Sequence, residues 1–186
     1  EWAKKKLKGN EIKGKTVGII GFGNVGRRFA EICNVLGLKV LIVSKSFIDV
    51  KDQYPEYRSC DLNEVLKQAD IISFHCKPNR DGSSVITSKE FNLMKNNAFI
   101  INTARGNLVS EVDLCEAIKE NKIGGAAIDV FETEPATNNT LFGLDNVLLT
   151  PHIAASTSEA QIIVAEMVAN QFVDYFLKNK VNNSVI

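Results

Sequence analysis

Three short segments carry side chains that could move a proton and hold a carboxylate. They contain Arg105, a glutamate within residues 131–135, and His152, one of only two histidines in the chain. Histidine titrates near neutral pH, and a neighbouring carboxylate orients its ring and stabilises its cation. Arginine can hold a carboxylate through two parallel hydrogen bonds. These residue types suit redox chemistry on a 2-hydroxy acid. The alternative for His152 is a core histidine, but the preceding proline and the small polar residues after it favour an exposed loop.

A glycine cluster offers a place for a phosphate group. Gly21, Gly23 and Gly26 form a GxGxxG pattern between an apolar run and a helical pattern. In that context the first glycine permits a tight turn, the second lets the backbone approach a pyrophosphate, and the third lets helix and strand pack closely. The free N–H groups and the positive end of the helix dipole would hold the anion. The alternative is a glycine turn without a ligand.

The end of the second apolar run bears on the choice of cofactor. An acidic residue about 20 positions after the glycines would bind the ribose hydroxyls of NAD. Ser44 stands there instead, followed by Lys45 and Ser46. Two hydroxyls and a cation suit a 2′-phosphate, which a carboxylate would repel, so NADP(H) is favoured over NAD(H). The alternative is that Lys45 is a surface lysine and an NAD site tolerates the serine.

Strands and helices must alternate to position these residues. The pattern predicts an α/β fold, a Rossmann-type doubly wound parallel sheet with helices on both faces and right-handed crossovers. Ligands of such sheets bind at the carboxyl ends of the strands. The basic stretch 1–15 is typical of a solvated helix face. We expect strands at 16–20, 39–43, 71–74, 98–101, 125–130 and 147–150. Helices are expected at 25–36, 61–68, 88–94 and 110–121, followed by a long amphipathic helix at 156–178. The expected loops are 46–59, 79–84 and 135–146.

Composition restricts the class of protein. The chain has 186 residues, suited to one domain, and 22 basic against 22 acidic side chains. A formal net charge of zero argues against a nucleic-acid or anionic-membrane binder. No apolar run approaches the roughly 20 residues of a membrane span, and no secretory signal is present. The four cysteines fit neither a zinc site nor a disulfide framework, so we expect reduced thiols, no metal and a cytoplasmic location.

Longer motifs resemble a known family. Residues 14–21, 127–138 and 145–153 together resemble the D-isomer-specific 2-hydroxyacid dehydrogenases, and the similarity runs from Gly14 to Val185. Within that family, the last two motifs are most similar to enzymes that act on D-3-phosphoglycerate, in serine biosynthesis. The resemblance implies an oxidoreductase domain that transfers a hydride between NAD(P) and C2 of a D-2-hydroxy acid. Two alternatives remain: an NADPH-dependent reductase of glyoxylate or hydroxypyruvate, and a non-catalytic nucleotide sensor of the corepressor type.

The resemblance also implies residue roles. Arg105 would bind the substrate carboxylate, and Glu134 would pair with His152, the proton donor and acceptor. The loop 152–155 would close over the nicotinamide. The implied cofactor-binding positions are Gly21, Gly23, Asn24, Val25, Gly26, Ser44, Lys45, His75, Cys76, Thr103, Ala104, Arg105, Asp129, His152, Ile153, Ala154 and Ala155.

The resemblance also predicts a second domain and a dimer. Its members insert the cofactor domain into a discontinuous substrate domain, so we interpret residues 1–186 as the isolated cofactor domain, inactive without the rest. Family members usually dimerise through this domain, and helices 110–121 and 156–178 could offer apolar surface, although such stripes also serve core packing. Three features depart from the family: Ser44 replaces the usual aspartate, Pro78 is displaced by one position, and the loop 135–146 is short.

Overall fold

The computed structural model describes residues 9–184. The chain divides into two compact units, Glu1–Pro151 and His152–Ile186. The first unit is built around a β-sheet, and the second contains one long helix, α6 (Ser158–Lys178), with the segment that follows it.

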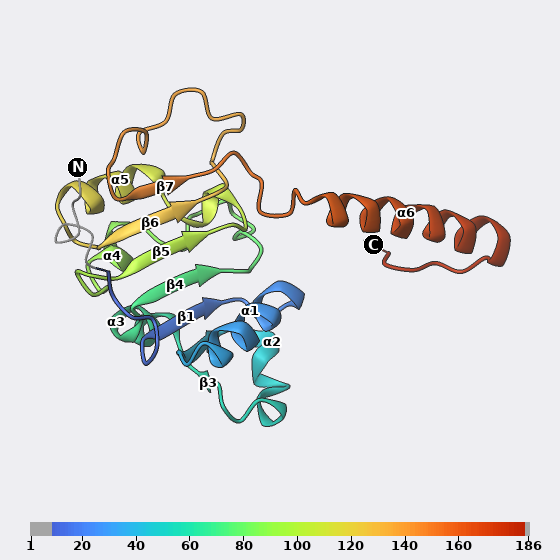
Figure 1. Ribbon diagram of the computed structural model, residues 1–186, viewed down its shortest axis with the longest axis horizontal. Helices are drawn as coiled ribbons and strands as arrows, with labels where there is room; N and C mark the ends of the chain where they lie inside the picture. The colour runs from blue at the N-terminus through green and yellow to red at the C-terminus, as the bar shows by residue number, and fades with distance from the viewer. Residues whose placement is uncertain (1–8, 185–186) are drawn as a thin grey trace. The chain divides into compact units, whose positions relative to one another are not determined.

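The first unit contains a parallel sheet of seven strands in the order β3-β2-β1-β4-β5-β6-β7 (Figure 1). This confirms the predicted doubly wound sheet. The strand order reverses between β1 and its neighbours β2 and β4, and the carboxyl ends of strands at such a switch point form the usual ligand crevice. The strands are β1 (Thr16–Ile20), β2 (Lys39–Val43), β3 (Arg58–Ser59), β4 (Ile71–Phe74), β5 (Phe99–Asn102), β6 (Gly125–Ile128) and β7 (Val147–Leu149).

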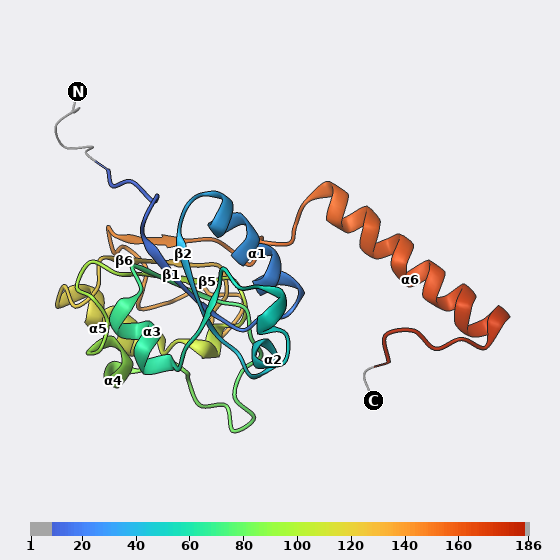
Figure 2. The same ribbon diagram turned by 90° about the horizontal axis from the view of Figure 1, so that it is seen from below.

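Helices cover both faces of this sheet, as Figure 2 shows for α1 (Asn24–Val35) on one face and α3 (Leu62–Gln68), α4 (Ser88–Phe91) and α5 (Glu111–Lys119) on the other. Side chains of a strand alternate between the faces, so β1 contributes to two hydrophobic clusters. Ile19 packs on the α1 side with Phe47 of the short helix α2 (Lys45–Ile48), and Ile20 packs on the other. The continuous apolar runs read as strands are therefore buried on both faces near β1.

Several predicted boundaries are wrong by a few residues, and one predicted loop is not a loop. Residues 46–59 contain most of α2, a 3-10 turn at Lys51–Gln53 and the edge strand β3. Helix 88–94 ends at Phe91, and the strand expected at 125–130 ends at Ile128. Residues 9–15 are not helical, which corrects the predicted helix face, and residues 1–8 lie outside the described part of the chain.

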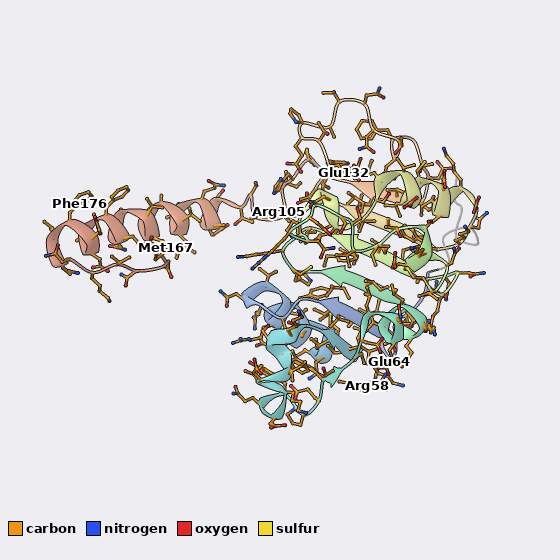
Figure 3. The ribbon with its side chains drawn as sticks, turned by 180° about the vertical axis from the view of Figure 1, so that it is seen from behind. Arg58, Glu64, Arg105, Glu132, Met167 and Phe176 are labelled. Atoms are coloured by element: carbon orange, nitrogen blue, oxygen red, sulfur yellow. The ribbon has the colours of Figure 1, made fainter. Side chains whose placement is uncertain are left out.

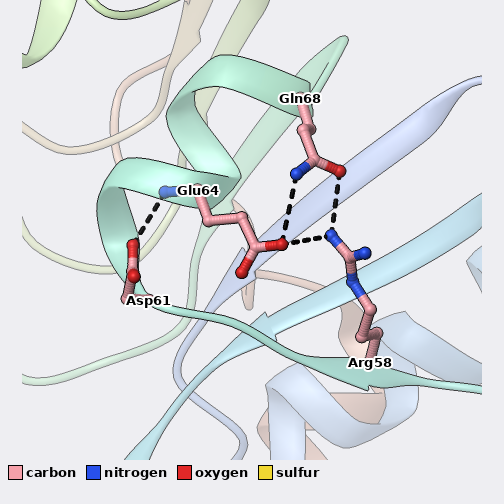
Figure 4. Close-up of polar contacts among 4 residues, drawn as sticks. All are labelled: Arg58, Asp61, Glu64 and Gln68. Carbon is pink, nitrogen blue, oxygen red and sulfur yellow. Dashed lines mark hydrogen bonds and ion pairs between the residues drawn. The ribbon is translucent and has the colours of Figure 1, made fainter.

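A polar network ties the edge strand to the sheet's neighbouring helix (Figure 4). Asp61 caps α3 as expected, because its Oδ1 accepts a hydrogen bond from the Glu64 N–H at 2.8 Å. Arg58 on β3 donates to Glu64 Oε1 at 2.6 Å and to Gln68 Oε1 at 2.8 Å. These groups are exposed, so water and salt screen the ion pair and it contributes little to stability. Its role is to fix the short strand beside β2.

The second unit contains α6, which begins after Thr157 and ends at Asn179. The Thr157 hydroxyl accepts the Ala160 N–H at 3.1 Å, and Asn179 has a left-handed backbone with φ of 50°. Met167 and Phe176 project from opposite sides of the helix (Figure 3), so apolar side chains lie on more than one of its faces. No residue of this helix is buried. Within residues 9–184, no helix is both long and apolar enough to cross a membrane.

Candidate active site

The glycine turn joins β1 to α1 at the carboxyl edge of the sheet. Gly21 has a left-handed φ of +102°, and its N–H donates to the Val43 carbonyl at 2.9 Å, which holds the turn beside the end of β2. A Cβ at Gly21 would clash with the His75 carbonyl, and one at Gly26 would clash with the Gly21 carbonyl. Both glycines are therefore required by chain packing alone.

Gly23 has a different environment from the other two glycines. A Cβ placed there meets no atom within 4 Å, and the backbone φ of −79° suits any residue. Gly23 is the N-cap of α1 and has no side chain with which to cap it, and the first turn of the helix contains no acidic residue. Free N–H groups and a positive helix end thus face open space, which fits a dinucleotide pyrophosphate in this cradle.

The residues after β2 lie next to the glycine turn. Ser44 and Ser46 share a hydrogen bond between their hydroxyl oxygens at 2.9 Å. Lys45 starts α2 and is exposed. Among the described residues no carboxylate pairs with Lys45, so its charge is available to a ligand. The structure therefore brings the two hydroxyls together, and the binding of a 2′-phosphate by Ser44, Lys45 and Ser46 stays a prediction.

His75 and Cys76 follow β4 beneath the glycine turn. The His75 N–H donates to the Ile20 carbonyl at 2.8 Å, its Nε2 lies 2.9 Å from the Ser73 hydroxyl, and its ring centroid lies 5.0 Å from that of Phe29 on α1. Burial lowers the pKa of His75 to about 4 and raises the pKa of the Cys76 thiol. The imidazole is therefore neutral at pH 7 and supports the turn. Its contact with a cofactor stays a prediction.

The arginine predicted to bind substrate sits in a turn that a buried asparagine shapes. Asn102 ends β5 and is 1% exposed; its Nδ2 donates to the Arg105 carbonyl at 2.8 Å, and its Oδ1 accepts the Ala104 N–H at 3.1 Å. Arg105 is exposed at the edge of the sheet where the strands end (Figure 3), and its Nη1 donates to the Ala104 carbonyl at 2.6 Å. Sequence reasoning missed Asn102, although an asparagine that ends an apolar strand is a turn signal.

The arginine turn touches the loop that carries the predicted glutamate. A Cβ on Gly106 would collide with the Phe131 carbonyl and the Glu132 nitrogen, so only glycine allows these two backbones to approach. Within the loop, Glu134 Oε1 accepts the Phe131 N–H at 2.9 Å. The structure therefore brings the segments of Arg105 and Glu134 together, as their positions at strand ends predicted.

Helix α5 anchors the glutamate loop through Glu111. Its Oε1 accepts the Glu132 N–H at 2.8 Å, and its Oε2 accepts from Asn139 Nδ2 at 2.7 Å. Glu132 returns the contact, because its Oε1 accepts the Glu111 N–H at 3.3 Å. Sequence reasoning missed this role, since Glu111 shows only the usual preference of acidic residues for a first helical turn.

Asp129 follows β6 and is only 3% exposed. Its Oδ1 accepts a hydrogen bond from the Thr150 hydroxyl at 2.5 Å, and its N–H donates to the Asn102 carbonyl at 2.9 Å. Thr150, a third residue whose role sequence reasoning missed, thus holds the ends of β6 and β7 in register. The predicted contact of Asp129 with the nicotinamide stays a prediction.

His152 is the first residue of the second unit. It is exposed and has a left-handed backbone with φ of 54°, and Ile153, Ala154 and Ala155 after it are exposed as well. The pairing of its imidazole with Glu134 stays a prediction. Among the described residues, no three histidine, cysteine or carboxylate side chains gather in a group that could hold a metal ion.

A parallel sheet with an open glycine cradle at its switch point defines a dinucleotide-binding domain. The family model described as "D-isomer specific 2-hydroxyacid dehydrogenase, NAD binding domain" matches residues 1–154. This match covers most of the chain, which therefore belongs to the D-isomer-specific 2-hydroxyacid dehydrogenase family.

Relatives named for different activities are equally similar to the chain. A D-3-phosphoglycerate dehydrogenase of Archaeoglobus fulgidus is 38% identical over 100% of the chain and 35% of its own length. A glyoxylate reductase of Thermococcus litoralis is 38% identical over 94% of the chain and 53% of its own length. An acyclic imino acid reductase solved with NADPH and D-Arg has a TM-score of 0.85 and 35% identity, covering 98% of the chain and 60% of that protein. The chain thus spans about a third to 60% of these relatives.

Proposed function

We propose that this chain is the cofactor-binding part of an enzyme that transfers a hydride between NAD(P) and C2 of a D-2-hydroxy acid. One observation carries the proposal: the arginine turn and the glutamate loop touch through Gly106 at the edge of the sheet that also holds the open glycine cradle. Membership in a dehydrogenase family supports the same reading. Residues 1–186 would then be the nucleotide domain of a two-domain protein.

The residues of the chain would divide the work of the reaction. A bound nicotinamide dinucleotide supplies or accepts the hydride. Arg105 binds the substrate carboxylate through its guanidinium, which fixes C2 in place and polarises its oxygen. His152 takes the proton from the C2 hydroxyl during oxidation and returns it during reduction. Glu134 orients that imidazole and stabilises its cation.

Two substrates fit this proposal, and D-3-phosphoglycerate, as used in serine biosynthesis, is the leading one. The motifs at 127–138 and 145–153 favour it, and so does the relative from Archaeoglobus fulgidus. Reduction of glyoxylate or hydroxypyruvate with NADPH is the second candidate. It is supported by Lys45, which pairs with no carboxylate among the described residues and stands between two serines in the sequence, and by the equally similar glyoxylate reductase.

We also propose that the cofactor is NADP(H) in preference to NAD(H). Ser44, Lys45 and Ser46 give the end of β2 a cation and two hydroxyls where an NAD site carries a carboxylate. A 2′-phosphate placed there would meet no acidic group at positions 44–46. The alternative, an NAD site that tolerates serine, predicts equal affinity for both dinucleotides.

Self-association is a further part of the proposal. Helix α5 turns Leu114, Cys115, Ala117 and Ile118 inward, so it offers little surface. Helix α6 exposes large apolar side chains such as Phe172 and Phe176. An apolar helix is normally covered, and we propose a homodimer that sedimentation analysis of the purified protein would detect. A cytoplasmic location remains a prediction.

A turnover assay tests the proposed function. The natural polypeptide that contains this chain would be assayed with D-3-phosphoglycerate, glyoxylate and hydroxypyruvate, each with NADH/NAD and NADPH/NADP. We expect activity that His152→Asn and Arg105→Ala abolish, and that Arg28→Gln, a change on the exposed face of α1, leaves unchanged. Tight dinucleotide binding with no turnover of any 2-hydroxy or 2-keto acid would refute the enzyme and favour a nucleotide sensor.

A further inference from the structure

Arg27 presents a cation at the start of α1 whose environment differs from that of its neighbour. Its guanidinium carbon lies 5.8 Å from the centre of the Phe22 ring and 6.0 Å from that of the Tyr54 ring. Within the described residues no carboxylate pairs with it. By contrast, Arg28 pairs with Glu31 at 2.8 Å. A guanidinium packed on aromatic faces and lacking an acidic partner keeps its full charge for a ligand.

An aromatic cluster fixes where that cation stands. Phe22, between two glycines of the cradle, is 3% exposed. The centroid of its ring lies 4.6 Å from that of the Phe47 ring and 5.2 Å from that of the Tyr54 ring. Phe47 directly follows Ser46 in the chain. The cluster therefore brings the glycine turn, the end of β2 and the loop at Tyr54 into contact, and the Arg27 guanidinium lies against two of its rings.

We propose that Arg27 is a second cation of a ribose 2′-phosphate subsite and acts together with Ser44, Lys45 and Ser46. The inference rests on the proposed function, because it assigns one end of the same dinucleotide site. A planar guanidinium already held against rings loses little side-chain freedom when it binds phosphate through two hydrogen bonds. The ligand class is a nucleotide with a 2′-phosphate, such as NADPH or 2′,5′-ADP.

The acidic residues of the loop after α2 form no described ion pair with Arg27 or Lys45. The loop after α2 contains Asp49, Asp52 and Glu56, and among the described residues none of them pairs with Arg27 or Lys45. Within the described part of the chain, Arg27 and Lys45 are therefore two cations that a carboxylate does not engage. The ribose hydroxyl of NADH gains nothing comparable from a guanidinium, so the contribution of Arg27 should be selective for the phosphorylated cofactor.

Calorimetric titration of the 186-residue chain with NADPH, NADH, 2′,5′-ADP and 5′-AMP tests the inference. We expect Arg27→Gln to weaken NADPH and 2′,5′-ADP by about tenfold or more, the loss of one charge-assisted contact, and to leave NADH and 5′-AMP within about twofold. Arg28→Gln, its neighbour with an acidic partner, is the matched control and should change neither. Arg27→Lys should give an NADPH affinity between those of wild type and Arg27→Gln, because lysine keeps the positive charge but cannot donate two parallel hydrogen bonds to the phosphate.

Other outcomes would overturn the inference in distinguishable ways. Equal weakening of NADPH and NADH by Arg27→Gln would show that Arg27 acts on a part common to both cofactors. Unchanged NADPH affinity would show no contact at all. In both cases the proposed function survives. If the folded wild-type chain, verified by its urea transition, binds neither dinucleotide, the proposed function fails together with the inference.

Discussion

Replacing Gly23 by alanine separates a glycine needed for folding from one needed for a ligand. The free chain has room for the methyl group, because no atom lies within 4 Å of the added Cβ. The backbone also accepts it, since φ is −79°. A dinucleotide pyrophosphate in the cradle would occupy the same space. We therefore expect Gly23→Ala to leave the fold intact and to weaken cofactor binding.

The size of both effects follows from packing. Alanine is less favourable than glycine at an N-cap, which lowers stability, but it also restricts the unfolded chain, which raises stability. Each effect is about 1 kcal/mol or less, so the free energy of unfolding should stay within about 1 kcal/mol of wild type. Forcing a methyl group into an occupied contact costs about 1–3 kcal/mol. That range corresponds to about a 5- to 150-fold rise in the Kd for NADPH and NADH alike.

Gly18→Ala is the matched control for this experiment. A Cβ at Gly18, inside β1, would clash with Val65 Cγ1 on α3, so this variant should lose about 1–3 kcal/mol of stability. Its folded form should bind dinucleotide like wild type, because Gly18 is remote from the cradle. Urea unfolding measures stability, and calorimetric titration measures affinity. A folded Gly23→Ala chain that binds with wild-type affinity would refute the close backbone approach.

Further expectations concern the groups that support the site. Asn102→Ala removes the partners of two backbone groups and should lower the free energy of unfolding by about 1–3 kcal/mol in urea. The folded chain holds the pKa of His75 at about 4, below the ordinary 6.5, so the unfolded chain binds more protons between these values. Stability should thus fall as pH drops from 6.5 to 4, and His75→Gln should flatten that slope. Ser44→Asp should weaken NADPH by about tenfold or more relative to NADH, and equal effects would contradict an NADP site.

The sheet could be predicted from the sequence because strands at the centre of a sheet covered on both faces must be continuously apolar. Residues 16–20 and 39–43 match β1 and β2 to the residue. Two helix caps were also predicted correctly, because the side chains of Asp61 and Ser110 accept backbone hydrogen bonds at the starts of α3 and α5. Signals of this kind lie within a few residues of the element they define.

The elements missed by sequence reasoning depend on contacts between distant residues. Helix α2 has only four residues, and Phe47 within it is buried against Phe22 of the glycine turn. Strand β3 has two residues and is stabilised by its pairing with β2 and by the contacts of Arg58. Local propensity is too weak to specify elements this short, and tertiary packing decides them.

The site shows the same division. Placing Arg105 and a glutamate at strand ends required only the order of strands and helices. The groups that hold their turns act over longer separations: Glu111 binds the Glu132 backbone, and Thr150 binds the Asp129 carboxylate. Neither residue stands out by type, because each performs a task that many polar side chains could perform. Their roles become visible only in three dimensions.

Within the glycine motif, Gly23 is better evidence for a bound ligand than Gly21 and Gly26 are. Gly21 and Gly26 are explained by a left-handed turn and by close approach of the chain to itself, so a protein could require both without binding any nucleotide. Gly106 is likewise required by contact between two loops. Of the three glycines in the motif, only Gly23 leaves unfilled space that a side chain could have used. Folding therefore accounts for the outer glycines of the motif but not for the middle one, where we propose that a dinucleotide pyrophosphate binds.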